Sequence, residues 1–490
     1  MLKRLFAALF CAAALAATAA EKNPSLPGEL SREISYTSSR YQRGMLWRYR
    51  VWLPPALKTA KSKPALYMIL ELRPELMGNV FHAMMEEGVI PPGVVIFLRS
   101  GVLPPTRRGG AYRAMRAEYI DQVGRDFPDL LVEELIPEAL KRAGAEIDPS
   151  PDMHFITGWS SGGAAAWNAA WFRNDYFRRV YLASPTFSAM RGAEEVPFLI
   201  RKCEPRPIRV YMTSGTREPD YYFGSSLYAA LNAASGLEFA GYDFRYEQFK
   251  HEGHGPRLGD PWVWRRAMGF LWANWPDPVK ALGPQIRIRR LVEDRSPWEE
   301  VKTVFPEKKP LTTSFGTYTF SGGKIFLERD GGKTEVASGF GHIAAIGISS
   351  DLWRLYIADS ARRFIFAMSI MPDGKLDQLY RHAPLHLAHD CRVIGATDLD
   401  VLADDRVLAA TELGVQGIVS YGLTDLILPL PGDLPAERLT VKDKWLYVSS
   451  GSRVFRRKLK VAAGDPSRMA APSTPGYSDG FVYERSHLIP

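Results

Sequence analysis

Cysteine is scarce in this 490-residue chain, which contains three. Cys11, Cys203 and Cys391 lie too far apart to form the closely spaced framework that stabilises small disulfide-rich domains. C-x-x-C pairs and the H-E-x-x-H pattern are also absent from the sequence, so it offers no compact metal-ligand motif. Stability must therefore come from a hydrophobic core, for which 46% hydrophobic residues suffice.

Long runs of basic residues are absent as well. The formal net charge is +8, but the basic residues form short clusters such as QIRIRRL and RVFRRKLK. A nucleic-acid surface needs a denser basic patch with interleaved aromatic side chains. We therefore expect these clusters to form a solvated basic face, and we expect no nucleic-acid partner.

The N-terminal stretch MLKRLFAALFCAAALAATAA, residues 1–20, contains an apolar run. Two basic residues precede the run and small residues end it, which is typical of a secretory signal peptide cleaved after Ala20. The run is too short and alanine-rich for a convincing membrane span, although a retained anchor is the alternative. We expect a secreted or periplasmic protein with no stable membrane insertion after signal cleavage.

Residues 21–275 alternate between short apolar segments and helical patterns. PALYMILEL, GVVIFLRSG and DMHFITGW read as strands, whereas FPDLLVEELIPEALKRAG has the apolar spacing of three and four that is typical of a helix. This alternation predicts an α/β domain with a mostly parallel sheet covered on both faces by helices.

The remaining chain has a different character. Residues 276–312 are rich in proline and charge, which predicts a linker. Residues 313–462 read as short strands separated by Gly, Asp and Ser turns, and similar hairpins recur at roughly 40-residue spacing, which predicts an all-β, propeller-like domain. Its length allows three or four blades, fewer than a comfortably closed ring. Residues 463–490 read as an irregular tail.

The pattern G-x-S-x-G lies at residues 158–162, where a predicted strand is followed by a predicted helix. The glycines allow the tight turn that lifts a serine above a sheet, and the N–H of the next residue then faces a developing oxyanion. The context predicts Ser160 as a nucleophile and Ser161 as an oxyanion donor. The alternative is a small-residue turn ahead of a helix.

Candidate partners follow Ser160 in the order acid and then histidine, which α/β-hydrolases require. Glu218 and Asp220 come after the strand RPIRVYMTSG, and we take Glu218 as the acid with Asp220 in reserve. Either could instead be an exposed loop carboxylate. In KHEGHGPR, His254 lies between two glycines and is the predicted base, whereas His251 is predicted to be a surface or pocket-wall residue.

The segments RAEYIDQVGRDFPDLLVEELIPEAL, DPSPDMHFITGWSSGGAAAWNAAWF and PIRVYMTSGTREPD resemble the esterase D and enterochelin esterase-like group of α/β-hydrolases, which includes feruloyl and acetylxylan esterases. The resemblance covers about residues 30–275. It implies Ser160 as nucleophile, Glu218 at the acid position, His254 as base and no cofactor. Relatives commonly have Asp-Gly after the third strand, whereas this chain has Glu71 and Leu72, the latter at the position of the second oxyanion donor.

Aromatic residues surround these positions in the sequence. Trp159 precedes the predicted nucleophile and Tyr221 follows the predicted acid, and such rings suit sugars or phenolic acyl groups. We predict that Trp159 and Tyr221 bind substrate, with core packing as the alternative. Trp262 and Trp264 are better explained by helix packing.

The stretches GISSDLWRLYIADSARRFIFAMSIMPDGKL and GATDLDVLADDRVLAATELGVQGIVSYG are similar to later blades of gluconolactonase and senescence-marker-type propellers. That resemblance implies a divalent cation held by a glutamate, asparagines and an aspartate, and Asp398 matches the aspartate. Ala344 stands where an Asn-Gly pair is expected, and the sequence has no asparagine after Asn274. One aspartate is a poor hard-cation site, so we expect a noncatalytic accessory region and no metal.

The sequence thus predicts a secreted serine carboxylic-ester hydrolase that needs no cofactor. The expected substrates are small-molecule or glycan esters, chiefly acetyl or feruloyl esters of carbohydrates, with siderophore esters as a further class. Two alternatives are a metal-dependent sugar lactonase and a noncatalytic carbohydrate-binding pseudoenzyme.

Overall fold

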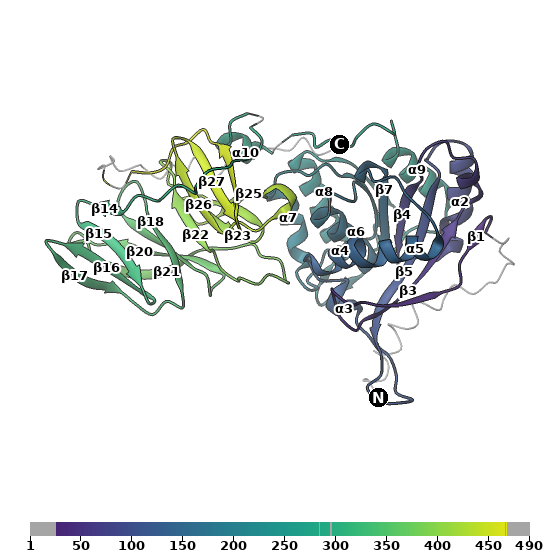
Figure 1. Ribbon diagram of the computed structural model, residues 1–490, viewed down its shortest axis with the longest axis horizontal. Coiled ribbons are helices and arrows are strands. Elements are labelled where there is room, and N and C mark those ends of the chain that lie inside the picture. Colours follow the sequence, from purple (N-terminus) through teal and green to yellow (C-terminus); the bar gives the residue numbers. More distant parts are fainter. Residues whose placement is uncertain (1–25, 284, 295, 466, 468–490) are drawn as a thin grey trace.

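The N-terminal part of the protein is built on a ten-stranded mixed sheet (Figure 1). The computed structural model describes residues 26–465, apart from 284 and 295, together with 467, so the predicted signal peptide and most of the predicted tail lie outside the described residues. The strand order is β1-β3-β5-β4-β7-β8-β9-β12, with β2 paired to β3 and β6 to β5. The strands are β1 (Glu29–Leu30), β2 (Ile34–Thr37), β3 (Leu46–Leu53), β4 (Ala65–Leu70), β5 (Gly93–Leu103), β6 (Arg113–Ala114), β7 (His154–Trp159), β8 (Arg179–Ala183), β9 (Arg209–Gly215) and β12 (Asp243–Phe249).

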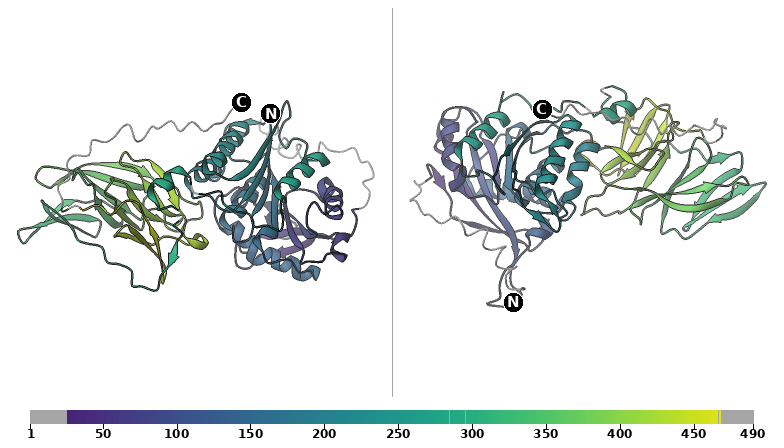
Figure 2. Two further views of the ribbon diagram at one scale, coloured as in Figure 1. Left: turned by 90° about the horizontal axis from the view of Figure 1, so that it is seen from above. Right: turned by 180° about the vertical axis from the view of Figure 1, so that it is seen from behind.

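Helices cover both faces of this sheet (Figure 2). They are α2 (Pro74–Glu86), α3 (Arg116–Tyr119), α4 (Asp126–Leu130), α5 (Ile136–Ala143), α6 (Ser161–Phe172), α7 (Val196–Lys202), α8 (Ser226–Ala240) and α9 (Pro261–Leu271), and a π-helical turn, Leu131–Leu135, joins α4 to α5. One core cluster includes side chains of α4 to α8, and a second includes those of α2 and α9. Strands β5, β4, β7, β8, β9 and β12 run parallel. The predicted α/β fold class is confirmed, and no helix in the described part of the chain is both long and apolar enough to cross a bilayer.

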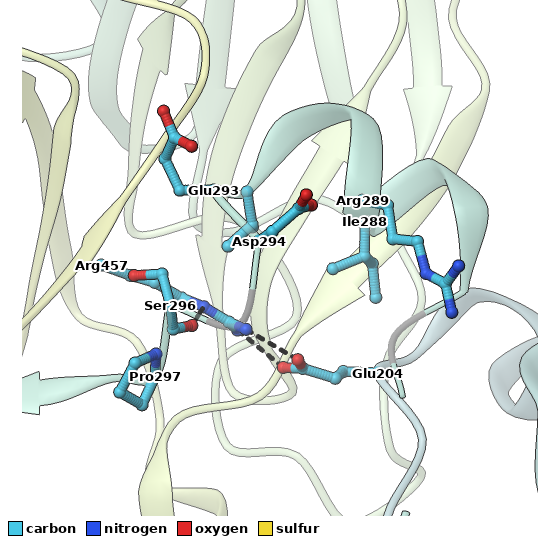
Figure 3. Close-up of a pocket in the computed structure, with 9 residues that line it drawn as sticks. Glu204, Ile288, Arg289, Glu293, Asp294, Ser296, Pro297 and Arg457 are labelled. Carbon is cyan, nitrogen blue, oxygen red and sulfur yellow. Dashed lines mark hydrogen bonds and ion pairs between the residues drawn. The ribbon is translucent and has the colours of Figure 1, made fainter. Parts of the chain in front are cut away.

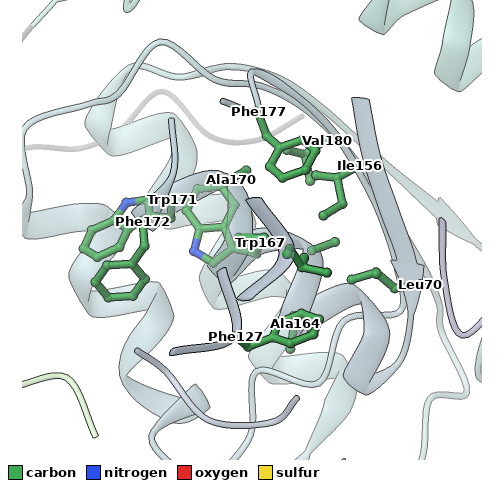
Figure 4. Close-up of a cluster of buried hydrophobic side chains, with 14 of the residues drawn as sticks. Leu70, Phe127, Ile156, Ala164, Trp167, Ala170, Trp171, Phe172, Phe177 and Val180 are labelled. Carbon is green, nitrogen blue, oxygen red and sulfur yellow. The ribbon is translucent and has the colours of Figure 1, made fainter. Parts of the chain in front are cut away.

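Helix α6 is buried along its whole length (Figure 4). Its sequence, SGGAAAWNAAWF, places small residues where the helix crosses the sheet and large rings at its far end. A methyl group on Gly158 of β7 would lie 2.2 Å from the carbonyl oxygen of Gly162 in α6, closer than atoms can approach. The small residues therefore let the helix that follows Ser160 lie directly against the strand that precedes it.

The C-terminal part consists of four antiparallel sheets of four strands each, a propeller-like arrangement that the sequence predicted. The first sheet holds β14 (Leu311–Thr313), β15 (Gly316–Ser321), β16 (Lys324–Arg329) and β17 (Gly332–Ala337), and the second β18 (Ile343–Ile348), β19 (Arg354–Asp359), β20 (Phe364–Ile370) and β21 (Leu376–Pro384). The third holds β22 (Asp398–Val401), β23 (Val407–Thr411), β24 (Gly414–Ile418) and β25 (Thr424–Leu428), and the fourth β26 (Arg438–Lys442), β27 (Trp445–Ser450), β28 (Arg453–Lys458) and β13 (Glu299–Glu300). The first sheet lies farthest from the α/β domain and the fourth close to it (Figure 1).

The first sheet carries polar side chains on one of its faces. Lys324 pairs with Glu335 at 2.7 Å, and the Thr319 hydroxyl donates to Glu328 at 2.8 Å. The opposite face contributes Tyr318 and Leu327 to a core shared with the second sheet. A terminal repeat with a polar outer face needs no further sheet against it, so this sheet caps the array.

The segment between the two domains is built into the C-terminal domain. It contains α10 (Ile286–Leu291) and β13, and β13 pairs with β28 in the fourth sheet. Farther along, the Lys308 ammonium donates to Asp398 and, at 2.6 Å, to the Leu399 carbonyl oxygen, both on the inner strand β22. The segment predicted as a linker therefore forms the outer edge strand of the fourth sheet and then reaches the inner strand of the third.

Charged pairs join the two domains. Arg457 of β28 donates two hydrogen bonds, of 2.6 and 2.7 Å, to the Glu204 carboxylate. These two residues lie beside a cavity of about 200 Å³ between α10 and β28 (Figure 3). Arg206 pairs with Asp433, and the Glu204 N–H donates to the Ile427 carbonyl oxygen at 3.1 Å. Side chains with little exposure thus fix one domain on the other.

His382 on β21 predicts acid sensitivity of the C-terminal domain. Its side chain is 9% exposed, and burial, with a contribution from Arg354, lowers its pKa to about 4. Because the folded-state pKa lies below the unfolded value, the stability it contributes is complete above pH 6.5 and is lost as the pH falls toward 4. The difference amounts to about 3 kcal/mol.

We expect His382→Gln to reduce the loss of unfolding free energy between pH 6.5 and pH 4, measured by denaturant titration. His342→Gln is the matched control, because His342 is exposed. Equal pH dependence in both variants would contradict the assignment.

Candidate active site

Ser160 lies in a strained turn between β7 and α6. Its φ is 58° and its ψ is −122°, values that cost a non-glycine residue about 1–3 kcal/mol. Its N–H donates to the Ala183 carbonyl oxygen of the neighbouring strand at 2.9 Å. The strand-turn-helix context predicted for residues 158–162 is therefore present, and it raises the serine at the carboxyl edge of the sheet.

His254 and Glu218 meet at the same edge. His254 Nδ1 lies 2.5 Å from Glu218 Oε2, and the Glu218 side chain is 1% exposed whereas that of His254 is 20% exposed. Glu218 Oε1 also accepts a hydrogen bond of 3.0 Å from the Gly215 N–H. Asp220 lies in the exposed strand β10 (Asp220–Tyr221), and His251 is exposed as well. The structure therefore brings Glu218, and not Asp220, to the histidine.

Ser184 and Thr186 complete this arrangement, and sequence reasoning missed both. The Ser184 hydroxyl donates to Glu218 Oε1 at 2.5 Å and accepts from the Gly255 N–H at 2.9 Å, so it ties the acid to the histidine loop. Thr186 Oγ1 lies 3.2 Å from Ser160 Oγ. The available signal was their position directly after β8, because parallel strands end at a common edge.

No hydrogen bond joins Ser160 to His254 in the described part of the chain. With Nδ1 engaged by Glu218, Nε2 is the nitrogen that remains to receive a proton. Hydrogen bonds of this kind are often long without substrate and shorten in the complex. The three side chains can therefore act as an acid, a base and a nucleophile once a substrate closes the gap.

The predicted oxyanion segment keeps a turn despite its lack of glycine. Glu71 adopts a positive φ of 62°, and its Oε1 accepts a hydrogen bond of 2.5 Å from the Ser100 hydroxyl. The Leu72 side chain is 6% exposed and packs in the core with α2. A methyl group on Gly162 would lie 3.1 Å from the Leu70 carbonyl oxygen, so this segment adjoins the first turn of α6, which begins with Ser161.

Asp121 is a buried acid beside the same turn. Its side chain is 4% exposed, and its Oδ1 has no hydrogen-bond partner in the described part of the protein. Burial raises the pKa of Asp121, whereas the Ser161 hydroxyl and the Arg116 guanidinium oppose that rise. Asp121 is therefore a buried acid whose pKa is affected by the residue whose N–H is the predicted oxyanion donor.

The aromatic residues predicted near the site lie in different surroundings. The Trp159 ring lies 5.4 Å from the His254 ring, centroid to centroid. Tyr221 is 43% exposed and stacks on Phe223 at 4.7 Å within the hairpin formed by β10 and β11 (Gly224–Ser225). Trp264 is buried in the core, whereas Trp262, predicted to pack, is 68% exposed. Of the two rings predicted to bind substrate, Trp159 is thus the one that contacts His254, and Tyr221 lies on the exposed hairpin.

The residues around Asp398 do not fit a divalent cation. Oδ1 accepts from the Lys308 ammonium and the Leu399 N–H, and Oδ2 accepts from the Leu439 N–H at 2.9 Å. The ammonium supplies positive charge that would repel a cation there. Within the described ranges, no group of three or more His, Cys, Asp or Glu side chains converges as a metal site would require.

Comparisons with known proteins gave matches among solved structures. No family model matches the sequence, and no curated protein matches it. A ferulic acid esterase aligns with 50% of this chain and 98% of its own, at 16% identity and a TM-score of 0.39. The enterobactin esterase from Shigella flexneri aligns at 18% identity and a TM-score of 0.39, over 51% of this chain and 60% of its own. A feruloyl esterase module from Clostridium thermocellum aligns at 12% identity and a TM-score of 0.36, over 52% of this chain and 93% of its own.

Proposed function

We propose that this protein is an exported serine carboxylic-ester hydrolase. The observation that carries the proposal is the contact between His254 Nδ1 and Glu218 Oε2, at the sheet edge where Ser160 lies in its strained turn. This is the relation that a histidine base needs to its orienting acid. The order of the three residues along the chain is also the one expected of an α/β-hydrolase.

In the proposed reaction, Ser160 Oγ attacks the ester carbonyl carbon and His254 Nε2 takes its proton. The N–H groups of Ser161 and Leu72 stabilise the oxyanion. The imidazolium then gives its proton to the leaving alkoxide, and water hydrolyses the acyl enzyme by the reverse proton path. Glu218 holds the imidazole in the tautomer that leaves Nε2 free, and it stabilises the imidazolium.

We propose acetyl or feruloyl esters of carbohydrates as the substrates. Trp159 beside the histidine and Tyr221 on the exposed hairpin offer flat surfaces for a sugar or a phenolic ring. The proposed export rests on the first 20 residues of the sequence.

The test combines turnover with covalent labelling. The purified protein is assayed with 4-nitrophenyl acetate, methyl ferulate and a feruloylated oligosaccharide, with and without a chelator. A fluorophosphonate should label the wild type at Ser160 and leave Ser160→Ala unlabelled. Absence of both turnover and labelling in folded wild type would overturn the proposal and favour a carbohydrate-binding pseudoenzyme. Turnover that is lost when a chelator is added would favour a metal-dependent sugar lactonase.

Gly215 provides a geometric test of the same site. A methyl group there would lie 2.2 Å from the Glu252 carbonyl oxygen and 2.4 Å from that of Gly253, in the loop that carries His254. Gly215→Ala must therefore displace the loop, and a shift of about 1 Å costs about 100-fold in kcat.

Gly259→Ala is the matched control for this kinetic measurement, because a methyl group at Gly259 would meet nothing within 4 Å. A Gly215→Ala variant with more than half of the wild-type kcat would contradict the predicted role of this loop.

A further inference from the structure

A loop of the C-terminal domain contacts the α/β domain where α4 begins. It lies between β21 and β22 and includes His389 and Asp390. The His389 N–H donates to the Val123 carbonyl oxygen at 2.8 Å. Asp390 Oδ2 accepts from the N–H groups of Arg125 and Asp126, at 2.5 and 3.0 Å. One carboxylate thus satisfies two main-chain donors where α4 begins, about 265 residues away in sequence.

The fit at this contact is close. A methyl group on Gly124 would lie 2.2 Å from the Asp390 carboxyl carbon, and one on Gly192 would lie 2.4 Å from the His389 ring. Both glycines therefore leave room for the loop. Gly192 comes after Thr186 in the chain, so the loop contacts the α/β domain at two separate segments, residues 123–126 and Gly192.

The contacted segment is also fixed to α6. The Asn168 side chain donates to the carbonyl oxygens of Gln122, at 3.2 Å, and Gly124, at 2.8 Å, and accepts from the Gly124 N–H at 3.3 Å. Asn168 belongs to α6, whose first residue is Ser161. Hydrogen bonds therefore connect Asp390 with the start of α4, and the segment just before it, residues 122–124, with Asn168 of the helix that follows Ser160.

We propose that Asp390 is a positioning residue for the ester hydrolase site: the C-terminal domain fixes residues 122–126, and Asn168 ties this segment to α6, whose first residue supplies the Ser161 N–H. The inference rests on the proposed function, in which that N–H stabilises the oxyanion. The donor acts on the transition state, so a looser segment lowers kcat and leaves KM nearly unchanged.

The test uses three variants of the full protein. Asp390→Ala removes the acceptor, Asp390→Asn keeps one acceptor oxygen, and Glu437→Ala is the matched control. Glu437 is an exposed carboxylate of the same domain that accepts from the Gly451 N–H at 2.9 Å. We expect Asp390→Ala to lower kcat about ten-fold with KM within two-fold, because removal of an oxyanion donor costs about 100-fold or more and loosening costs part of that. Asp390→Asn should recover part of the loss, and Glu437→Ala should match the wild type.

Hydrogen exchange of peptides covering residues 121–126 and 155–171 is the second measurement. Faster exchange of both peptides in Asp390→Ala than in Glu437→Ala supports the inference even if wild type shows no turnover, an outcome that overturns only the proposed function. Unchanged exchange of residues 155–171 overturns the inference. A kcat for Asp390→Ala within two-fold of an active wild type overturns it too.

Discussion

Replacing Glu218 by glutamine is expected to lower kcat by about 10,000-fold while the protein remains folded. The carboxylate receives three donors: His254 Nδ1–H, the Gly215 N–H and the Ser184 hydroxyl. An amide has one acceptor oxygen, and its NH2 group would face at least one of these donors. The imidazole would then adopt the wrong tautomer, and the imidazolium formed during reaction would lose its counter-charge.

Asp220→Asn is the matched control for this measurement. Asp220 is two residues away, is exposed and belongs to the short hairpin β10–β11, so its amide variant should keep wild-type kcat. Steady-state kinetics on 4-nitrophenyl acetate measure both. The assignment of the acid is wrong if Asp220→Asn loses activity and Glu218→Gln does not.

Asp433→Ala is expected to lower the free energy of unfolding by about 3–5 kcal/mol. Arg206 is 8% exposed, and its guanidinium lies 4.1 Å from the centre of the Trp171 ring while it pairs with Asp433. Burial lowers the pKa of Arg206, but Asp433, with smaller contributions from Cys203 and Tyr242, offsets this, and the pKa is raised. Without Asp433, a charge remains buried between the two domains with no counter-ion.

Denaturant unfolding followed by tryptophan fluorescence measures this loss, with Asp404→Ala as the control. The Asp404 side chain is 43% exposed and lies 3.9 Å from Arg406, so its removal should cost less than about 1 kcal/mol. A second variant, Arg206→Met with Asp433→Leu, removes both charges and should regain most of the stability. A double variant as unstable as Asp433→Ala would show that packing, and not the buried charge, explains the loss.

The sequence predicted the architecture because its strongest signals are local. Apolar runs such as ALYMIL of β4 and the helical spacing of residues 126–143 depend on burial within one element, and the structure confirms both. The hairpin spacing predicted propeller-like sheets for the same reason. The pairing of β13 with β28 could not be predicted, since Glu299 and Arg456 meet across more than 150 residues and β13 is only two residues long.

In the candidate site, too, some residues could be predicted from local sequence patterns and others could not. Ser160, Glu218 and His254 each follow a recognisable strand, so their positions could be read from local patterns. Ser184 acts through a contact with Glu218, which no local pattern encodes. The same holds for Asp390, because its partners are main-chain N–H groups and leave no mark in the sequence of either segment.

The place of β13 also affects the order in which the protein can fold during synthesis. Residues 299 and 300 leave the ribosome long before their partners on β28, whereas domains tend to fold as they emerge. Until residues 453–458 are made, β13 has no partner strand and Glu204 lacks the guanidinium of Arg457. The α/β domain can therefore form first, whereas the segment after it can pair only when the end of the chain has been made. A truncation before residue 453 would leave β13 unpaired and would remove the contact of Arg457 with Glu204.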